Sequence, residues 1–154
     1  MLILATDTTG KALSVALVRD DRLIGEIRLN TGYNHAVTHI PQIEKLLNDC
    51  QVKSSEIDLF ACTRGPGSFT GTRIGLSTIK AMAYAAGKPA LGISTLEALA
   101  APWQPLGPAI LCPLLDARNG RVFAAAYQAA DLKVLVKPGN YLATAFLDAL
   151  AMAL

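Results

Sequence analysis

The 154-residue chain is poor in cysteine and in charge. Its three cysteines are far apart and form no Cys-x-x-Cys pair, which excludes a zinc knuckle and a thioredoxin-like motif. We expect Cys50, Cys62 and Cys112 to be reduced, buried thiols of a cytoplasmic protein. Charged residues make up 17% of the chain, below the roughly 25% usual for soluble domains. The net charge of only +2 is weak support for direct nucleic-acid binding, which usually needs clustered Lys and Arg.

Long apolar runs are also missing. The first residues carry no basic segment, and Asp7 interrupts their apolar run, so no signal peptide is predicted. The longest uncharged stretch, 98–115, contains four prolines, which a membrane-spanning helix rarely tolerates together. We therefore expect no membrane association and a cytoplasmic location.

Hydrophobic residues, in contrast, make up 52% of the chain. This content supplies enough apolar surface to offset chain entropy, so intrinsic disorder is excluded. The length corresponds to about one typical domain. A surface with little charge suggests that a partner covers part of it.

Hydrophobic periodicity predicts alternating strands and helices. Period-two and buried apolar runs predict strands, and recurrence at three and four residues predicts helices. The expected strands cover 2–6, 12–19, 22–30, 57–63, 90–93, 109–115 and 122–127. The expected helices cover 35–49, 70–86, 95–101 and 142–154, with Pro41 either making the first turn of its helix irregular or marking the true start. Ser94 and Glu97 predict a capping box, and 137–140 predicts a turn. The order is typical of an α/β protein with a first lobe over 1–101, a proline-rich linker over 102–108 and a partial second lobe over 109–154.

The loop Gly65-Pro66-Gly67-Ser68-Phe69-Thr70-Gly71 is the most informative segment. It joins an expected strand to an expected helix, where backbone N–H groups can hold an anion. However, no lysine follows as in a P-loop, and the third glycine comes one residue late for a dinucleotide fingerprint. The alternative is a tight structural turn in which the glycines allow close backbone approach.

Other polar residues leave similar alternatives open. Asp7, followed by Thr8 and Thr9, could hold Mg²⁺ or phosphate at a strand end, or could form an Asx turn. His35 and His39 lie four apart, which is half a zinc site, but no third ligand is near in sequence, so no metal site is predicted.

Two further segments also allow two interpretations each. Asp116 and Arg118 form either a polar site or, as we favour, a local ion pair. The helix expected over 70–86 has small or apolar residues on nearly every face. We therefore expect either another subunit or the second lobe to cover its outer side.

In order and spacing, several segments together resemble the TsaB (YeaZ) family over about residues 1–128. The glycine-rich block is the most specific of them. The segments are 1–9, His35 with Pro41, 64–75, Gly92-Ile93-Ser94-Thr95-Leu96 and 116–123.

The resemblance implies an actin-like ATPase (ASKHA) fold, in which each lobe is ribonuclease-H-like, with the first lobe complete and the second short or truncated. It implies a non-catalytic scaffold that activates TsaD for threonylcarbamoyl transfer to adenosine 37 of tRNA. Thr95 and Leu99 stand where TsaD carries its metal-binding histidines, which indicates that this chain is not an enzyme. The alternative is a small ATP-dependent kinase or acyltransferase of the same fold, with Asp7 holding Mg²⁺.

The resemblance also implies partners and sites. The partners are a TsaD homologue, the ATPase TsaE and a second copy of the chain, with tRNA reached only through the complex. No cofactor is required, and weak ATP or ADP binding is left open at a degenerate nucleotide cleft. The cleft residues are Asp7, Thr8, Thr9, Gly65, Gly67, Ser68, Thr70 and Gly71. The expected interface residues are His35, Ile43, Leu46, Arg73, Gly75, Thr78, Ala81 and Met82.

Overall fold

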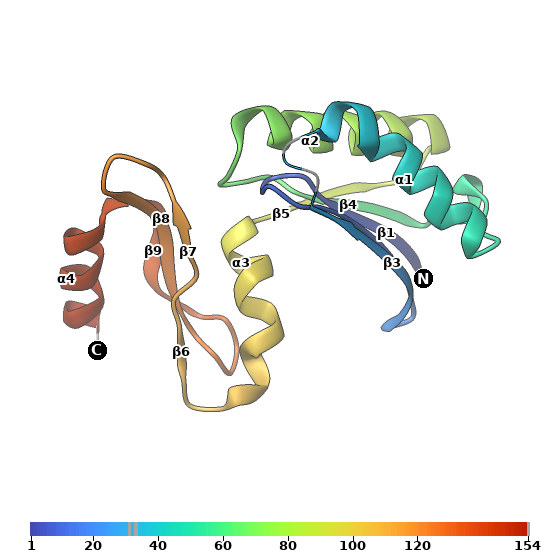
Figure 1. Ribbon diagram of the computed structural model, residues 1–154. Helices are drawn as coiled ribbons and strands as arrows, with labels where there is room; N and C mark the ends of the chain where they lie inside the picture. Colours follow the sequence, from blue (N-terminus) through green and yellow to red (C-terminus); the bar gives the residue numbers. More distant parts are fainter. Residues whose placement is uncertain (31, 33, 154) are drawn as a thin grey trace. The chain divides into compact units, whose positions relative to one another are not determined.

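The computed structural model describes residues 1–30, 32 and 34–153, with only the backbone at 105 and 106. The chain forms two compact units, Met1–Ile93 and Ser94–Leu154 (Figure 1). We describe each unit by itself and call them unit 1 and unit 2.

Unit 1 is built on a five-stranded sheet in the order β3-β2-β1-β4-β5. The first three strands form an antiparallel meander, and the last two continue it in parallel. The strands are β1 (Leu2–Asp7), β2 (Leu13–Arg19), β3 (Arg22–Leu29), β4 (Leu59–Thr63) and β5 (Ala90–Ile93). This order confirms the strands expected from the sequence in the first lobe.

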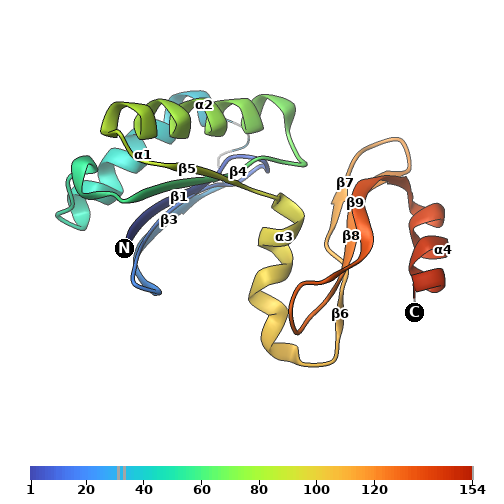
Figure 2. The same ribbon diagram turned by 180° about the vertical axis from the view of Figure 1, so that it is seen from behind.

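Two helices, α1 (His35–Asp49) and α2 (Phe69–Ala86), cover one face of this sheet (Figures 1 and 2). Alternate residues of β1 and β2 are buried, as expected for a sheet with one covered face. They pack with the inward residues of both helices into the main core. α1 begins at His35 and contains Pro41, so the helix does not start at the proline. A short 3₁₀ helix, η1 (Ser54–Glu56), precedes β4.

Unit 2 is a small antiparallel sheet with helices on both faces. β8 (Arg121–Gln128) pairs with β6 (Ile110–Leu111) and β7 (Leu114–Asp116), and also with β9 (Val134–Leu142). Alternate residues of β8 face opposite helices. Ala125 and Tyr127 pack with Leu96 and Ala100 of α3 (Thr95–Ala100). Ala124 and Ala126 pack with Phe146 of α4 (Ala143–Ala153).

The boundary between the units differs from the expected one. The units divide after Ile93 rather than after 101, because α3 buries its apolar residues against β8 of unit 2. Most of the expected linker belongs to a 3₁₀ helix, η2 (Ala101–Leu106), that continues α3. Ser94 is the N-cap residue of α3, but its side chain makes no capping hydrogen bond, so the predicted capping box is wrong.

The predicted turn over 137–140 is also wrong, because these residues lie inside β9. Pro138 fits there for two reasons. Among the described strands β9 pairs with β8 alone, and its register shifts where Ala124 faces Gly139 but Ala126 faces Val136. A proline has no N–H for a ladder hydrogen bond, and edge strands and bulges are the places in a sheet that tolerate this.

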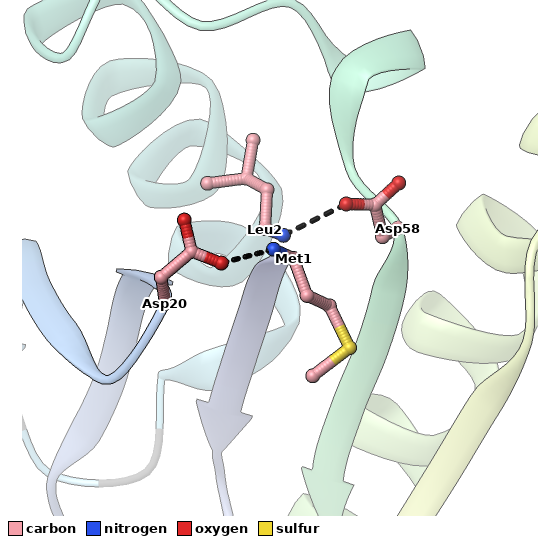
Figure 3. A network of polar contacts seen from close by, with 4 residues as sticks. All are labelled: Met1, Leu2, Asp20 and Asp58. Atoms are coloured by element: carbon pink, nitrogen blue, oxygen red, sulfur yellow. Dashed lines mark hydrogen bonds and ion pairs between the residues drawn. The ribbon is translucent and has the colours of Figure 1, made fainter.

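The start of β1 is held by two carboxylates from other segments (Figure 3). The Leu2 N–H donates to Asp58 Oδ2 at 2.8 Å, and the Met1 amino group pairs with Asp20. Asp58 also pairs with Lys88 at 3.4 Å. The first strand is therefore anchored to the β2–β3 turn and to the segment that enters β4.

Among the described helices, none combines the length and apolar character needed to cross a membrane.

Candidate functional site

Asp7 is the centre of a hydrogen-bond cluster at the end of β1. Its Oδ1 atom accepts from the backbone N–H of Thr9 at 2.8 Å, from Thr9 Oγ1 at 2.6 Å and from Thr63 Oγ1 at 2.6 Å. The bond to the N–H two residues later is an Asx turn. Thr63 ends β4, the parallel neighbour of β1, so the cluster joins the ends of two adjacent strands. Asp7 therefore forms the Asx turn that the sequence analysis gave as the structural alternative to a Mg²⁺ or phosphate site.

The glycine-rich loop turns the chain from β4 into α2. Gly65 has φ of +98°, a conformation that glycine adopts without steric cost. Ser68 is the N-cap of α2, and its Oγ accepts from the Gly71 N–H at 3.2 Å. This cap satisfies one of the free N–H groups at the helix start. The Ser68 N–H itself donates to the carbonyl oxygen of Thr9 at 2.7 Å.

The glycines of this block lie directly against the Thr8-Thr9 segment. A Cβ atom on Gly67 would come within 2.5 Å of the Thr9 carbonyl oxygen, and one on Gly71 would overlap the Thr8 carbonyl oxygen. A Cβ atom on Gly75 would overlap Thr8 Oγ1, which donates to the Gly71 carbonyl oxygen at 2.7 Å. The spacing of four puts Gly71 and Gly75 on one side of α2, and Gly67 lies just before the helix. The expected cleft residues therefore lie together, but they pack on each other.

This packing explains the spacing that fits neither phosphate-binding motif. The glycines remove side chains where α2 meets the end of β1, and two N–H groups at the helix start already bond within the cluster. The tight-turn alternative accounts for the block without a bound anion. Asp7 and Thr70 stay at the rim of the cluster, half-buried and exposed, respectively.

Half of the expected interface residues are in the core instead. His35, Ile43 and Leu46 lie on the face of α1 that packs on the sheet, each no more than 2% exposed. Gly75 is buried against Thr8. Helical periodicity sends positions 35, 39, 43 and 46 to one side, and that side is the inner one. His35, Ile43, Leu46 and Gly75 are therefore buried within unit 1 and not on the surface where an interface was expected.

The remaining four expected interface residues lie on α2 nearer the surface. Arg73 and Ala81 are exposed, and Thr78 is half-buried. Met82 is half-buried and packs against the core of unit 1.

Between α1 and α2 lies an open groove of about 440 Å³. Its lining residues are Ala36, Phe69, Thr70, Arg73, Ile74, Ser77 and Thr78. Phe69 is 75% exposed, and the Arg73 guanidinium carbon lies 5.2 Å from the centre of its ring. Such a stack is typical of a cation–π contact. The exposed side chains of Val37, Ile40 and Tyr84 add apolar surface on the same two helices.

Sequence reasoning missed Ala36, Phe69, Ile74 and Ser77 in this groove. Phe69 had a readable signal, because a large aromatic residue at the first position of a helix, directly after its cap, has little core to enter. The helix period also separates positions 70, 73, 77 and 81 from the buried glycine positions.

His39 is the buried titratable group of unit 1 with the largest change in pKa. Burial, and to a smaller extent the nearby His35, lower its pKa from the usual 6.5 to about 4. His35 Nε2 lies 2.8 Å from the carbonyl oxygen of Gly10. Both residues are 1% exposed and therefore belong to the core.

The remaining candidate groups are metal ligands, the Cys62 thiol and the pair Asp116 and Arg118. In the part of the chain that the structure describes, no three His, Cys, Asp or Glu side chains gather as metal ligands would. Burial raises the pKa of the Cys62 thiol, and Asp7 adds to this, so the thiol is a poor nucleophile. The expected ion pair of Asp116 with Arg118 is wrong. Asp116 Oδ1 accepts from the Arg118 backbone N–H at 2.7 Å, and among the described ion pairs none joins the two side chains.

Comparison with known proteins adds to this geometry. The family model described as "TsaD: tRNA N6-adenosine threonylcarbamoyltransferase" matches residues 29–146. The tRNA threonylcarbamoyladenosine biosynthesis protein TsaB of Bacillus subtilis is 38% identical over 128 residues, which is 83% of this chain and 56% of that protein. The chain thus spans about half the length of the curated relatives it matches.

Solved structures agree. YeaZ from Pseudomonas aeruginosa superposes with a TM-score of 0.80 at 30% identity, over 92% of this chain and 66% of that one. Component A of the (R)-2-hydroxyglutaryl-CoA dehydratase of Acidaminococcus fermentans matches with a TM-score of 0.56 at 12% identity, over 96% of this chain and 52% of that one. The second likeness concerns the fold alone, and it agrees with the expected actin-like ATPase fold.

Proposed function

The chain belongs to the TsaB (YeaZ) family, and from this premise we propose that it is a non-catalytic partner subunit in threonylcarbamoyladenosine biosynthesis on tRNA. In this role it binds a TsaD-type transferase through the outer surface of α1 and α2. TsaE joins the same assembly, and tRNA is reached through the complex.

One observation carries the proposal. In unit 1 the residues at the strand ends pack on one another, whereas the outer surface of α1 and α2 exposes apolar side chains. The cleft residues pack on one another, with Gly67 and Gly71 against Thr8 and Thr9. The α1/α2 surface, in contrast, exposes Phe69 and a groove beside it. An exposed apolar patch of this kind is typical of a protein interaction site.

The side chains at the place of the transferase's metal site support the non-catalytic role. Thr95 is 4% exposed at the start of α3, and Leu99 is 43% exposed one turn later. Neither side chain offers the imidazole nitrogen of a histidine ligand.

Reconstitution tests the proposal. The chain is mixed with a TsaD homologue, TsaE and tRNA, and co-elution and modified adenosine are measured. We expect a complex and stimulated modification. Ala81→Arg, which puts a large charged side chain on exposed α2 surface, is expected to weaken the complex at least about tenfold. Lys53→Glu, exposed outside both helices, is the matched control. Neither complex nor stimulation with the unchanged chain would refute the proposal.

Titration with Mg²⁺-ATP distinguishes the alternative function, an ATP-dependent kinase or acyltransferase, from the proposed one. We expect no cofactor requirement and at most weak ATP or ADP binding. Tight binding that Asp7→Ala abolishes, with the fold retained by circular dichroism, would favour the enzyme instead.

A further inference from the structure

The turn between β7 and β8 of unit 2 lies in the family-like segment 116–123, and the proposed function gives it no role (Figure 1). Asn119 and Gly120 hold its two central positions, with φ of +52° and +70°. The Arg121 N–H closes the turn by donating to the Arg118 carbonyl oxygen at 3.0 Å. Asparagine and glycine are the residues that such central positions favour. Local backbone chemistry therefore explains these two residues.

Arg118 is not explained in the same way. It precedes the central positions, yet its φ is +64°. Left-handed backbone is uncommon for residues other than glycine and asparagine, and glycine would adopt it without steric cost. The Arg118 N–H donates to Asp116 Oδ1 at 2.7 Å, which holds the backbone but uses no atom of the arginine side chain. Residues kept in unfavourable conformations concentrate at functional sites. The exposed guanidinium is therefore what distinguishes this residue from the glycine that the backbone would prefer.

A second arginine, Arg121, follows at the start of β8. Its Nε donates to Asn140 Oδ1 and its Nη2 to the Asn140 carbonyl oxygen, both at 2.7 Å. These two bonds orient the guanidinium plane and leave its remaining N–H groups available to a ligand. Among the described ion pairs, none involves Arg118 or Arg121. Asp116 is the one acid in the segment 116–121, so the segment carries a net charge of +1.

We propose that the β7–β8 turn contacts the phosphate backbone of tRNA within the assembled complex, with Arg118 and Arg121 donating to phosphate oxygens. The inference rests on the proposed function and names a contact with its RNA substrate. A planar guanidinium matches phosphate geometry, and contacts of this kind position a nucleic acid without reading its sequence.

Two features of the turn favour RNA over a protein carboxylate and limit the contact to the complex. Residues 117–120 include no large apolar side chain, whereas protein interfaces depend on buried aromatic and apolar anchors. Two phosphate contacts alone give only weak binding. The contact therefore adds to tRNA binding by the complex, in keeping with the small net charge of the chain.

The test measures tRNA binding by the complex of the full chain, a TsaD homologue and TsaE over a series of salt concentrations. We expect Arg118→Gly to weaken tRNA binding about three- to tenfold and to reduce the slope of log affinity against log salt by about 1. Because glycine adopts the left-handed backbone freely, this variant should melt at or above the Tm of the unchanged chain. Adding Arg121→Gln should weaken binding further. Lys133→Gln removes one exposed positive charge in the turn at the other end of β8 and should leave tRNA binding unchanged.

Each other outcome overturns a defined part. If the unchanged complex modifies tRNA and Arg118→Gly keeps both the affinity and the salt slope, the RNA contact is wrong while the proposed function stands. If the unchanged chain neither binds the transferase nor stimulates modification, both are wrong. If Arg118→Gly instead weakens binding to the TsaD homologue without tRNA, the turn binds a protein carboxylate and the RNA contact is overturned. An equal loss in Lys133→Gln would reveal a general charge effect, which also overturns the contact.

Discussion

Each unit contains antiparallel strands followed by a helix, and the two units differ in what is added to this motif. Unit 1 starts with β1, β2 and β3 followed by α1; unit 2 runs through the β6–β7 pair, β8 and β9 followed by α4. Asp7 ends β1 and Asp116 ends β7. Each accepts a hydrogen bond from the backbone N–H two residues later, at 2.8 Å and 2.7 Å.

Only unit 1 adds parallel strands beside its first strand in the described residues. β4 brings Thr63 to Asp7, and the glycine-rich block packs against the Thr8-Thr9 segment that follows Asp7. Asp7 is half-buried with three bonds to one oxygen, whereas Asp116 stays exposed. The same local turn therefore becomes a structural centre only where long-range contacts reach it. The predictions below test that difference.

The largest effect is expected from Gly71→Ala. The added Cβ would overlap the Thr8 carbonyl oxygen, which is backbone and cannot move without disturbing β1. We expect the free energy of unfolding to fall by about 4 kcal/mol. Gly10→Ala is the matched control in the turn after β1, because its Cβ would meet nothing closer than 4.0 Å. Thermal melts of both variants measure the effect. Equal melting temperatures would show that the close approach does not distinguish unit 1.

Acid should destabilise unit 1 through His39. Its pKa is lowered from 6.5 to about 4 in the folded chain, mainly by burial. Between these pH values the folded chain therefore binds fewer protons than the unfolded chain does. The stability associated with neutral His39 is fully present above pH 6.5, and the free energy of unfolding falls as the pH decreases from 6.5 towards 4. The shift corresponds to about 3 kcal/mol.

Urea unfolding at pH 7, 6, 5 and 4 should show this loss in the unchanged chain and a flatter dependence in His39→Leu. Both histidines of the chain lie in unit 1. Hydrogen exchange should therefore show the effect in β1, β2 and α1. An identical pH dependence in His39→Leu would contradict the assignment.

A smaller difference is expected between the two equivalent aspartates. Asp7→Ala removes the acceptor of three hydrogen bonds, and we expect a loss of about 2 kcal/mol. Asp116→Ala removes one local bond at an exposed turn, with an expected loss of about 0.5 kcal/mol. Chemical denaturation compares the two. Equal losses would mean that the contact from Thr63 contributes nothing.

Sequence reasoning recovered what depends on local pattern. The periodicity of 35–49 and of 70–86 predicted α1 and α2 within a residue, because an amphipathic period reflects burial on one side. It could not say which side of α1 faces the sheet and which faces outward. His35 and Leu46 were therefore assigned to the surface although they are in the core.

The other errors come from long-range contacts. β9 contains turn-forming residues around Pro138, and only pairing with β8 makes this stretch a strand. α3 looked like the end of the first lobe, but Leu96 packs against β8. The expected cleft residues lie close together, but their mutual packing depends on distances such as that between Gly71 and Thr8, which no spacing along the chain reveals.

The smallest effect concerns the anchoring of β1 by Asp58, which again has no counterpart among the described residues of unit 2. The backbone N–H of Leu2, and then Lys88, hold the pKa of the Asp58 carboxyl below its usual 3.8. The stabilisation is therefore present above pH 3.8 and is lost as the pH falls through the lowered pKa. We expect Asp58→Asn to lower Tm by about 1–3 °C at pH 7, with the difference narrowing in acid. Asp131→Asn is the control in unit 2, since the one hydrogen bond described for the Asp131 side chain is local and comes from the N–H of Lys133 two residues away. If both variants melt alike at pH 7, a carboxylate that joins distant strands stabilises no more than a local one, and the contrast between the units lies in the glycine block alone.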